Sequence, residues 1–124
     1  MHSLPTFADI VKAHQLIEPY IHRTPVMSSR SINQITGAEL FFKCENFQKV
    51  GAFKFRGACN SVFSLTDEEA KNGVCTHSSG NHAAALALAA RMRGIPSYIV
   101  MPETAPQIKK VAVEGYGAQI TFCE

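Results

Sequence analysis

Lys54 lies between two phenylalanines and next but one to an arginine, in the segment VGAFKFRGA (50–58). An amine held between aromatic rings and near a second cation is partly desolvated. It therefore loses its proton easily and can attack a carbonyl to form a Schiff base. The alternative is that Lys54 is an ordinary solvated lysine and that Phe53 and Phe55 are core residues. Taken alone, this segment favours the alternative.

A second polar stretch, HSSGNH (77–82), joins a short apolar run to an alanine-rich segment. Such a loop lies at the carboxyl end of a parallel strand, where sheets of this type bind ligands. Ser78 and Ser79 supply hydroxyls, and the first amides of the following helix favour a carboxylate or a phosphate. The alternative is that Ser79 and Asn81 only cap the helix. The stretch by itself leaves both interpretations open.

Other chemical patterns are weak in this sequence. His77 and His82 with Cys75 have a zinc-like composition, but they straddle a strand end and a glycine turn and have no fourth ligand. Neither GxSxG nor GxGxxG occurs. We therefore expect no metal site in the chain. The absence of both motifs argues against hydrolase and dinucleotide-binding functions.

Hydrophobic periodicity and turn residues predict the elements that position these stretches. Apolar residues at helical spacing, capping patterns and stop signals indicate helices over 6–21, 53–63, from Thr66 to Gly73, 81–93 and from Thr104 to Gly115, with a short helical patch ending at Gly37. Runs rich in β-branched and aromatic residues indicate strands over 39–45, 74–77, 97–101 and 118–123. The last three are of the kind buried on both faces of a sheet. Their alternation with helices predicts an α/β fold with a doubly wound parallel sheet.

Composition narrows the class of protein. The chain has 124 residues, 46% of them hydrophobic, and a formal net charge of +2 spread along its length. This balance argues against nucleic acid and membrane partners, and no apolar run is long enough to span a membrane. Four cysteines without a CxxC pair indicate reduced, buried thiols and a cytoplasmic location. Because the chain stops at Glu124 directly after a strand, we expect the domain to continue in a longer protein.

Two long motifs in order, KCENFQKVGAFKFRGA (43–58) and THSSGNHAAALALAA (76–90), resemble the serine and threonine dehydratases and serine racemases. These are pyridoxal-phosphate enzymes of the tryptophan-synthase β-like fold, fold type II, and the resemblance runs from about Phe7 to the end of the chain. It implies a fragment of a two-domain enzyme. Residues 1–66 would be the N-terminal part of the large domain, which carries the Schiff-base lysine, and 73–124 part of the small α/β domain.

The resemblance also implies roles for single residues. Lys54 would bond to the aldehyde of the cofactor, Phe53 would lie beside the pyridine ring, and Asn81 would donate to the phenolic oxygen of that ring. The substrate carboxylate would be bound by four side chains: Ser78, Ser79, Asn81 and His82. In a racemase Ser79 would in addition return a proton on the face opposite the lysine.

The implied function is a pyridoxal-phosphate-dependent L-serine or L-threonine ammonia-lyase, or dehydratase, which removes the Cα proton, eliminates the β-hydroxyl and yields a 2-oxo acid and ammonia. One alternative is a serine racemase of the same family. Another is a non-catalytic truncated fragment or binding module. The resemblance further implies a small hydroxy amino acid as substrate, a homodimer or larger assembly, and a divalent cation such as Mg²⁺ in the full-length protein, with ligands outside this chain.

Some positions depart from the family pattern. Ala52 replaces a serine that most relatives have, and Arg30, Val50 and Ala84 differ from the residues that surround ATP in eukaryotic racemases, so ATP activation is not expected. The family also holds the cofactor phosphate in a loop of consecutive glycines. The eight glycines here never adjoin, and we therefore expect that loop beyond Glu124.

Overall fold

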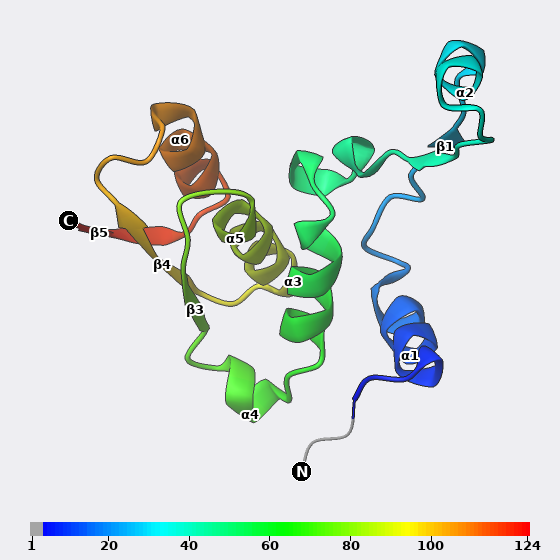
Figure 1. The fold of residues 1–124 in the computed structure, drawn as a ribbon. Coiled ribbons are helices and arrows are strands. Elements are labelled where there is room, and N and C mark those ends of the chain that lie inside the picture. The colour runs from blue at the N-terminus through cyan, green and yellow to red at the C-terminus, as the bar shows by residue number, and fades with distance from the viewer. Residues whose placement is uncertain (1–3) are drawn as a thin grey trace.

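A computed structural model describes residues 4–124, in the arrangement seen in Figure 1. The elements follow one another along the chain as α1 (Phe7–Ile17), β1 (Val26–Met27), α2 (Arg30–Thr36), β2 (Phe42–Lys43), the 3₁₀ turns η1 (Glu45–Phe47) and η2 (Lys49–Gly51), α3 (Lys54–Phe63), α4 (Asp67–Ala70), β3 (Val74–His77), α5 (Asn81–Arg93), β4 (Ser97–Pro102), α6 (Gln107–Gly115) and β5 (Gln119–Cys123).

The strands β3, β4 and β5 form a parallel sheet in sequence order, with Val74 opposite Ser97 and Tyr98 opposite Gln119. The crossover helices α5 and α6 contact each other, α5 contacts β3 and β4, and α6 contacts β5, so both helices lie on one face of the sheet. The strands predicted over 74–77, 97–101 and 118–123, the helix over 81–93 and the α/β class are confirmed.

The second face of this sheet is open in the described part of the chain. Along β4, Ser97, Ile99 and Met101 are buried, whereas Tyr98 and Val100 are about 40% exposed. The expected burial on both faces is therefore wrong for these residues. The physical reason is that both crossover helices lie on the other side.

The core is centred on α5, which lies between the sheet and α3. Six alanines of α5 are buried: Ala83, Ala84, Ala85, Ala87, Ala89 and Ala90. Their small side chains allow α3 and the sheet to approach α5 closely from different directions. Larger side chains, including Phe55 from α3 and Ile99 and Met101 from β4, fill the remaining space.

The N-terminal helix α1 begins as expected and ends early. The Asp9 carboxylate accepts hydrogen bonds from the N–H and the hydroxyl of Thr6, at 2.8 and 2.7 Å, and caps the helix start. The helix ends at Ile17 instead of Ile21 because Pro19 has no N–H to continue the ladder. Ile17 is the one buried residue of α1, so the predicted apolar face is largely exposed.

Three other predicted boundaries are wrong, one of them the end of the helix expected from Thr66 to Gly73, which stops at Ala70. The strand expected over 39–45 is reduced to Phe42–Lys43, paired antiparallel with Val26–Met27, because the chain turns into η1 at Glu45. The helix expected from Thr104 begins at Gln107, since Pro106 disfavours helical angles at the residue before it. The capping pair Thr66–Glu69 and the helix end at Gly37 are as expected.

Gly73 shows why the turn before β3 needs a glycine. Its φ is +83°, and a Cβ built on it would lie 2.4 Å from the carbonyl oxygen of Pro96. A side chain here would thus push β3 away from the segment that leads into β4. The start of the sheet depends on this close approach.

All four cysteines are free, but the expectation that they are buried holds only for Cys59. Burial raises the pKa of the Cys59 thiol to about 11. Cys44 is half-buried, and Cys75 and Cys123 are exposed on the short sheet. They are exposed because only one face of the sheet is covered.

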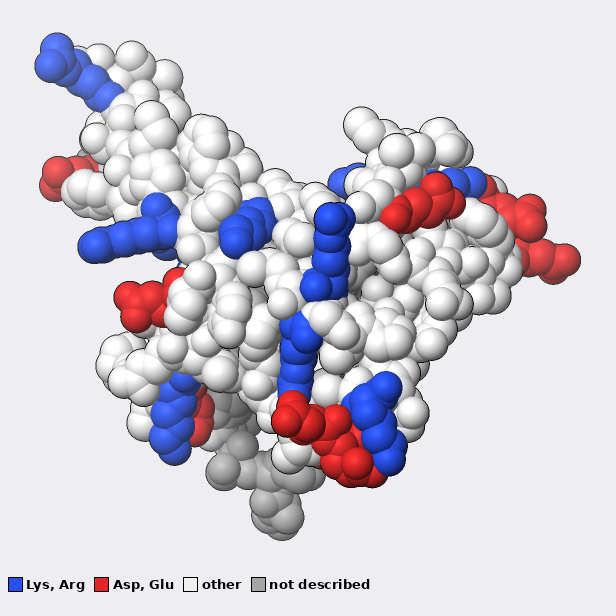
Figure 2. Space-filling model, turned by 180° about the vertical axis from the view of Figure 1, so that it is seen from behind, with Lys and Arg blue, Asp and Glu red and all other residues white. Residues whose placement is uncertain are grey.

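Charged side chains are interspersed on the face seen in Figure 2, where most of the surface carries neither sign. Among residues 4–124, no helix has the length and apolar character needed to cross a membrane.

Candidate functional site

Lys54 is the first residue of α3 and is exposed. Its Nζ lies 5.5 Å from the centre of the Phe53 ring, which is 61% exposed, whereas Phe55 is fully buried in the core. Residues 53 and 55 point about 200° apart around a helix of 3.6 residues per turn, so they cannot enclose the residue between them. The expected sandwich of Lys54 between two rings is wrong. The alternative is confirmed for the exposed Lys54 and for Phe55 as a core residue, but it is wrong for Phe53.

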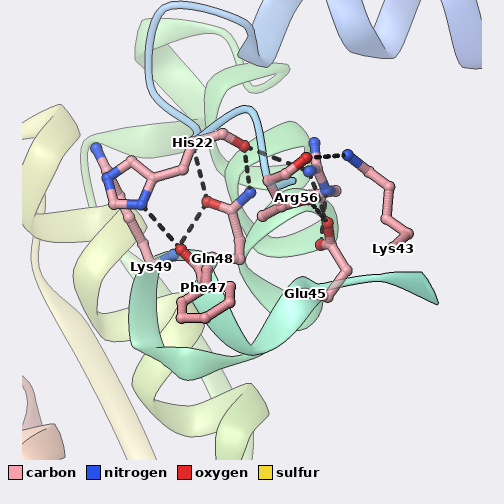
Figure 3. Close-up of polar contacts among 8 residues, drawn as sticks. His22, Lys43, Glu45, Phe47, Gln48, Lys49 and Arg56 are labelled. Carbon is pink, nitrogen blue, oxygen red and sulfur yellow. Dashed lines mark hydrogen bonds and ion pairs between the residues drawn. The ribbon is translucent and has the colours of Figure 1, made fainter. Parts of the chain in front are cut away.

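Arg56 is engaged by a carboxylate rather than by the space around Lys54. Its Nε and one terminal nitrogen each donate to Glu45, both at 2.8 Å, in a bidentate pair seen in Figure 3. These bonds from Arg56 lower the pKa of Glu45 to about 2, and Glu45 in turn raises the pKa of Arg56. The arginine therefore joins α3 to η1, a role that the sequence interpretation missed.

The same cluster connects the extended segment before β1 to the turns before α3. The Thr24 hydroxyl donates to Glu45 at 2.6 Å, and the Lys43 ammonium donates to the Thr24 carbonyl at 2.9 Å. Gln48, only 3% exposed, accepts from the N–H of His22 at 2.9 Å and donates to the carbonyl of His22 at 2.8 Å. We call these residues the polar clamp: His22, Thr24, Lys43, Glu45, Gln48 and Arg56.

The turn between the polar clamp and Lys54 has an unusual backbone. Val50 and Gly51 both have positive φ, +58° and +68°. The left-handed region suits Gly51 but is unfavourable for a β-branched residue such as Val50. Val50 nevertheless packs against the core, and the Gln48 side chain accepts from the N–H of Lys49 at 3.0 Å. The turn that leads into α3 is thus held in one conformation from both sides.

The helices α3 and α5 lie side by side and run in the same direction. At their C-terminal ends, Arg93 donates to the carbonyls of Val62 and Leu65. Ala58 in the middle of α3 and His82 in the first turn of α5 line one open groove of about 380 Å³, which continues along Ser61 and Val62. Ala58 lies one helical turn after Lys54 on the same face of α3. Lys54 itself does not line this groove, but Ala58 on its face of α3 does, together with His82 in the first turn of α5.

The HSSGNH turn leaves the start of α5 without a side-chain cap. Gly80 is the N-cap residue, and no side chain bonds the amides of the first turn. The Ser78 hydroxyl oxygen accepts from the N–H of Gly80 at 3.2 Å. The interpretation that Ser79 or Asn81 caps the helix is therefore wrong. Uncapped first-turn amides can bind an anion.

Ser78 and Ser79 face a different groove from His82. Their groove, also about 380 Å³, lies at the carboxyl ends of the three parallel strands and is lined as well by His77, Val100, Pro102 and Cys123. Of the four residues expected at a substrate carboxylate, Ser78 and Ser79 thus line one groove and His82 the other, while Asn81 lines neither. Which side the carboxylate would approach stays a prediction.

Asn81 has a partner that the sequence interpretation missed. Its Oδ1 accepts a hydrogen bond from the ammonium of Lys109, in the first turn of α6, at 2.7 Å. A sequence signal for this contact exists. Consecutive parallel strands place the N-terminal turns of both crossover helices at the same edge of the sheet, so a long polar side chain at the start of α6 can reach the start of α5.

The donor set fits part of a pyridoxal-phosphate molecule. An exposed amine, an aromatic ring beside it and an amide match the aldehyde, the pyridine ring and the phenolic oxygen of the cofactor, and the uncapped amides of α5 match the carboxylate of an amino acid substrate. The sequence has no adjacent glycines for a phosphate loop. Lys54 would hold the aldehyde and Asn81 the ring oxygen.

Comparison with known proteins gives a consistent picture. A model of the family described as "Pyridoxal-phosphate dependent enzyme" matches residues 17–124. A beta-hydroxyaspartate dehydratase of Paracoccus denitrificans is 59% identical over 121 residues, which are 98% of this chain and 38% of that protein.

Solved structures agree. Maize serine racemase matches with a TM-score of 0.91 and 59% identity, over 93% of this chain and 35% of that chain. The processed form of threonine deaminase isoform 2 from Solanum lycopersicum matches with a TM-score of 0.86 and 34% identity, over 94% of this chain and 34% of that one. The chain thus spans between a third and two fifths of the length of these relatives, and its fold is that part of fold type II.

Proposed function

Because the chain belongs to the family of pyridoxal-phosphate dependent enzymes, we propose that the protein carrying it is an L-serine or L-threonine ammonia-lyase. It would remove the Cα proton of the substrate, eliminate the β-hydroxyl and release a 2-oxo acid and ammonia. The observation that carries the proposal is the side-by-side arrangement of α3 and α5. It places Ala58, one helical turn after Lys54 on the same face of α3, in one groove with His82 at the uncapped start of α5.

Lys54 has the chemistry for two tasks. Its amine would hold the aldehyde of the cofactor and, once the substrate amine has replaced it, would remove the Cα proton. Its exposure at the start of α3 leaves the nitrogen accessible for both tasks. The cofactor, when bound, supplies an electron sink for the pair left at Cα. The exposed ring of Phe53 would lie beside it.

The start of α5 would bind and orient the substrate. The first-turn amides and the hydroxyls of Ser78 and Ser79 would hold the carboxylate, with Asn81 and His82 beside them. Three substrates are candidates: L-serine, L-threonine and β-hydroxyaspartate. The last is supported by the name of the Paracoccus relative.

A serine racemase is the second candidate. It is supported by the maize relative and by the exposed position of Ser79 just after β3, from which a hydroxyl could return a proton. Chiral analysis of serine after incubation separates the two activities. Ser79→Ala should abolish racemisation and spare much of the elimination.

The proposal is tested by reduction with borohydride in the full-length protein loaded with pyridoxal phosphate. We expect the visible absorbance to disappear and the cofactor to remain attached to the peptide that contains Lys54. Lys49→Met, a lysine five residues earlier whose Nζ lies 5.7 Å from the Phe55 ring, should label like the wild type, and Lys54→Ala should not label. Label on another lysine, or none, would refute the assignment.

The third candidate is a binding module without catalysis. Titration of the 124-residue chain with pyridoxal phosphate addresses it. Since the glycine loop is not in this chain, we expect weak binding. Tight stoichiometric binding would contradict the proposed location of the phosphate site.

Further properties of the full-length protein are proposed from the family resemblance. These are a large domain containing residues 1–66 and a small domain containing 73–124, stimulation by Mg²⁺, a homodimeric or larger assembly and a cytoplasmic location. Light scattering and activity with and without a chelator test the assembly and the metal.

A further inference from the structure

We propose that Lys109 is a positioning residue of the candidate site, which fixes the orientation of the Asn81 side-chain amide. The ammonium of Lys109 lies 2.7 Å from Asn81 Oδ1. This inference rests on the proposed function, in which Asn81 donates to the ring oxygen of the cofactor. It assigns to α6 a part in a site otherwise built from α3 and α5.

The orientation follows from the chemistry of the two groups. An ammonium can only donate hydrogen bonds, whereas an amide accepts at Oδ1 and donates at Nδ2. Lys109 therefore selects the rotamer in which Oδ1 points to α6. Both N–H groups of Nδ2 then remain free for another acceptor. In the flipped rotamer the Nδ2 donors would face a positive charge, which is unfavourable.

The bond also changes the strength of the amide as a donor. A charged donor on Oδ1 polarises the amide, so its N–H groups become better donors to a negatively charged oxygen. The phenolic oxygen of the cofactor is such an acceptor. Lys109 thus acts on the cofactor only through Asn81, without touching it.

The tertiary fold explains why Lys109 and not its neighbour has this position. Lys109 and Asn81 are 28 residues apart and come from the first turns of α6 and α5. Lys110, next in sequence, donates to the carbonyl of Glu103 at 2.6 Å and lies over the Phe122 ring. The two lysines therefore form a matched pair, one directed at the site and one directed at β5.

The experiment compares Lys109→Met, Lys109→Arg and Lys110→Met in the full-length protein loaded with pyridoxal phosphate. Lys109→Met removes one hydrogen bond, and we expect the dissociation constant of the cofactor to rise about fivefold in this variant. The absorption maximum of the lysine-bound cofactor should shift with it. Lys109→Arg should recover most of the affinity because it keeps a donor, and Lys110→Met should behave as the wild type.

A double-mutant cycle with Asn81→Ala separates positioning from a general loss of stability. If Lys109 acts through Asn81, then Lys109→Met has no further effect on affinity or absorbance in the Asn81→Ala background. A full effect of about fivefold in that background would overturn the inference, as would wild-type affinity and absorbance for Lys109→Met in the Asn81-containing protein.

A measurement without cofactor distinguishes failure of this inference from failure of the proposed function. The NMR signals of the Asn81 side-chain amide in the cofactor-free protein should move in Lys109→Met and stay in place in Lys110→Met. Unmoved signals in Lys109→Met overturn the inference even if borohydride labels Lys54. Moved signals with an unlabelled Lys54 would support the contact of Lys109 with Asn81, whereas the proposed function, and the cofactor role that rests on it, would fail.

Discussion

Between residues 18 and 51, the only buried side chains are Thr24 and Gln48, and both are polar. From residue 52 onward the buried side chains are apolar except for Ser97, and most of them form one core around α5. The two regions are therefore held by different forces. The first depends on directional bonds of the polar clamp, and the second on the volume and apolar area of its packed side chains.

The difference between the two regions matters for Lys54, because both regions hold the backbone at this residue. Lys54 lies at the boundary, preceded by a turn that the polar clamp holds and followed by a helix that the core holds. Directional bonds fix a position closely but depend on single atoms and on charge. Packing tolerates changes of charge in the solvent but not changes of volume. Substitutions in the two regions should consequently respond to different conditions.

The largest expected effect is in the core. Phe55→Ala removes a fully buried ring and should lower the free energy of unfolding by about 3–5 kcal/mol. Phe41→Ala, at a ring that is 66% exposed in the first region, should cost less than about 1 kcal/mol. Urea denaturation followed by circular dichroism measures both. Equal losses of stability in the two variants would contradict the proposed contrast between the two regions. They would show that residues outside this chain cover the Phe41 ring.

The next effect is the response of the polar clamp to pH. The folded-state pKa of Glu45 is about 2, below its ordinary value of 4.5, so its contribution to stability is present in full above pH 4.5 and is lost as the pH falls through 2. Glu45→Gln should lower the free energy of unfolding by about 2–3 kcal/mol at pH 7. On acidification this variant should lose less stability than the wild type.

The control for this prediction is Glu39→Gln, at an exposed glutamate of the same region, which should follow the wild-type curve. Stability is measured by denaturation at several pH values between about 7 and 2. Parallel curves for Glu45→Gln and the wild type would contradict the assignment of this charge to the clamp.

The smallest effect concerns the backbone between the two regions. At the φ of +58° of Val50, Val50→Gly should be about 1 kcal/mol more stable than Val50→Ala, because glycine adopts left-handed angles without strain. Both variants lack the same packed side chain, so the difference isolates the backbone. Gly57→Ala inside α3, where an added Cβ meets nothing within 4 Å, should have the opposite sign. If alanine gave the more stable protein at position 50 as well as at position 57, the assignment of backbone strain to Val50 would be contradicted.

Prediction from the sequence succeeded where the signal was local. The helix over 81–93 follows from its alanines and from Gly94, which ends it with φ +75°. The capping pairs at Thr6 and Thr66 are contained within four residues each. The start of α3 next to Lys54 was expected for the same reason. Prolines 19 and 106 displaced two boundaries by altering the backbone of single residues.

The sequence by itself determined the α/β class, the order of helices and strands, and the presence of an amine and a hydroxyl-rich turn at two element ends, because each depends on neighbours along the chain. Only the tertiary structure decided that Phe55 turns away from Lys54, that Arg56 pairs with Glu45, and that Lys109 reaches Asn81. Those outcomes depend on the direction of side chains and on contacts between residues 11 to 28 positions apart, which only the packing of the elements brings within bonding distance.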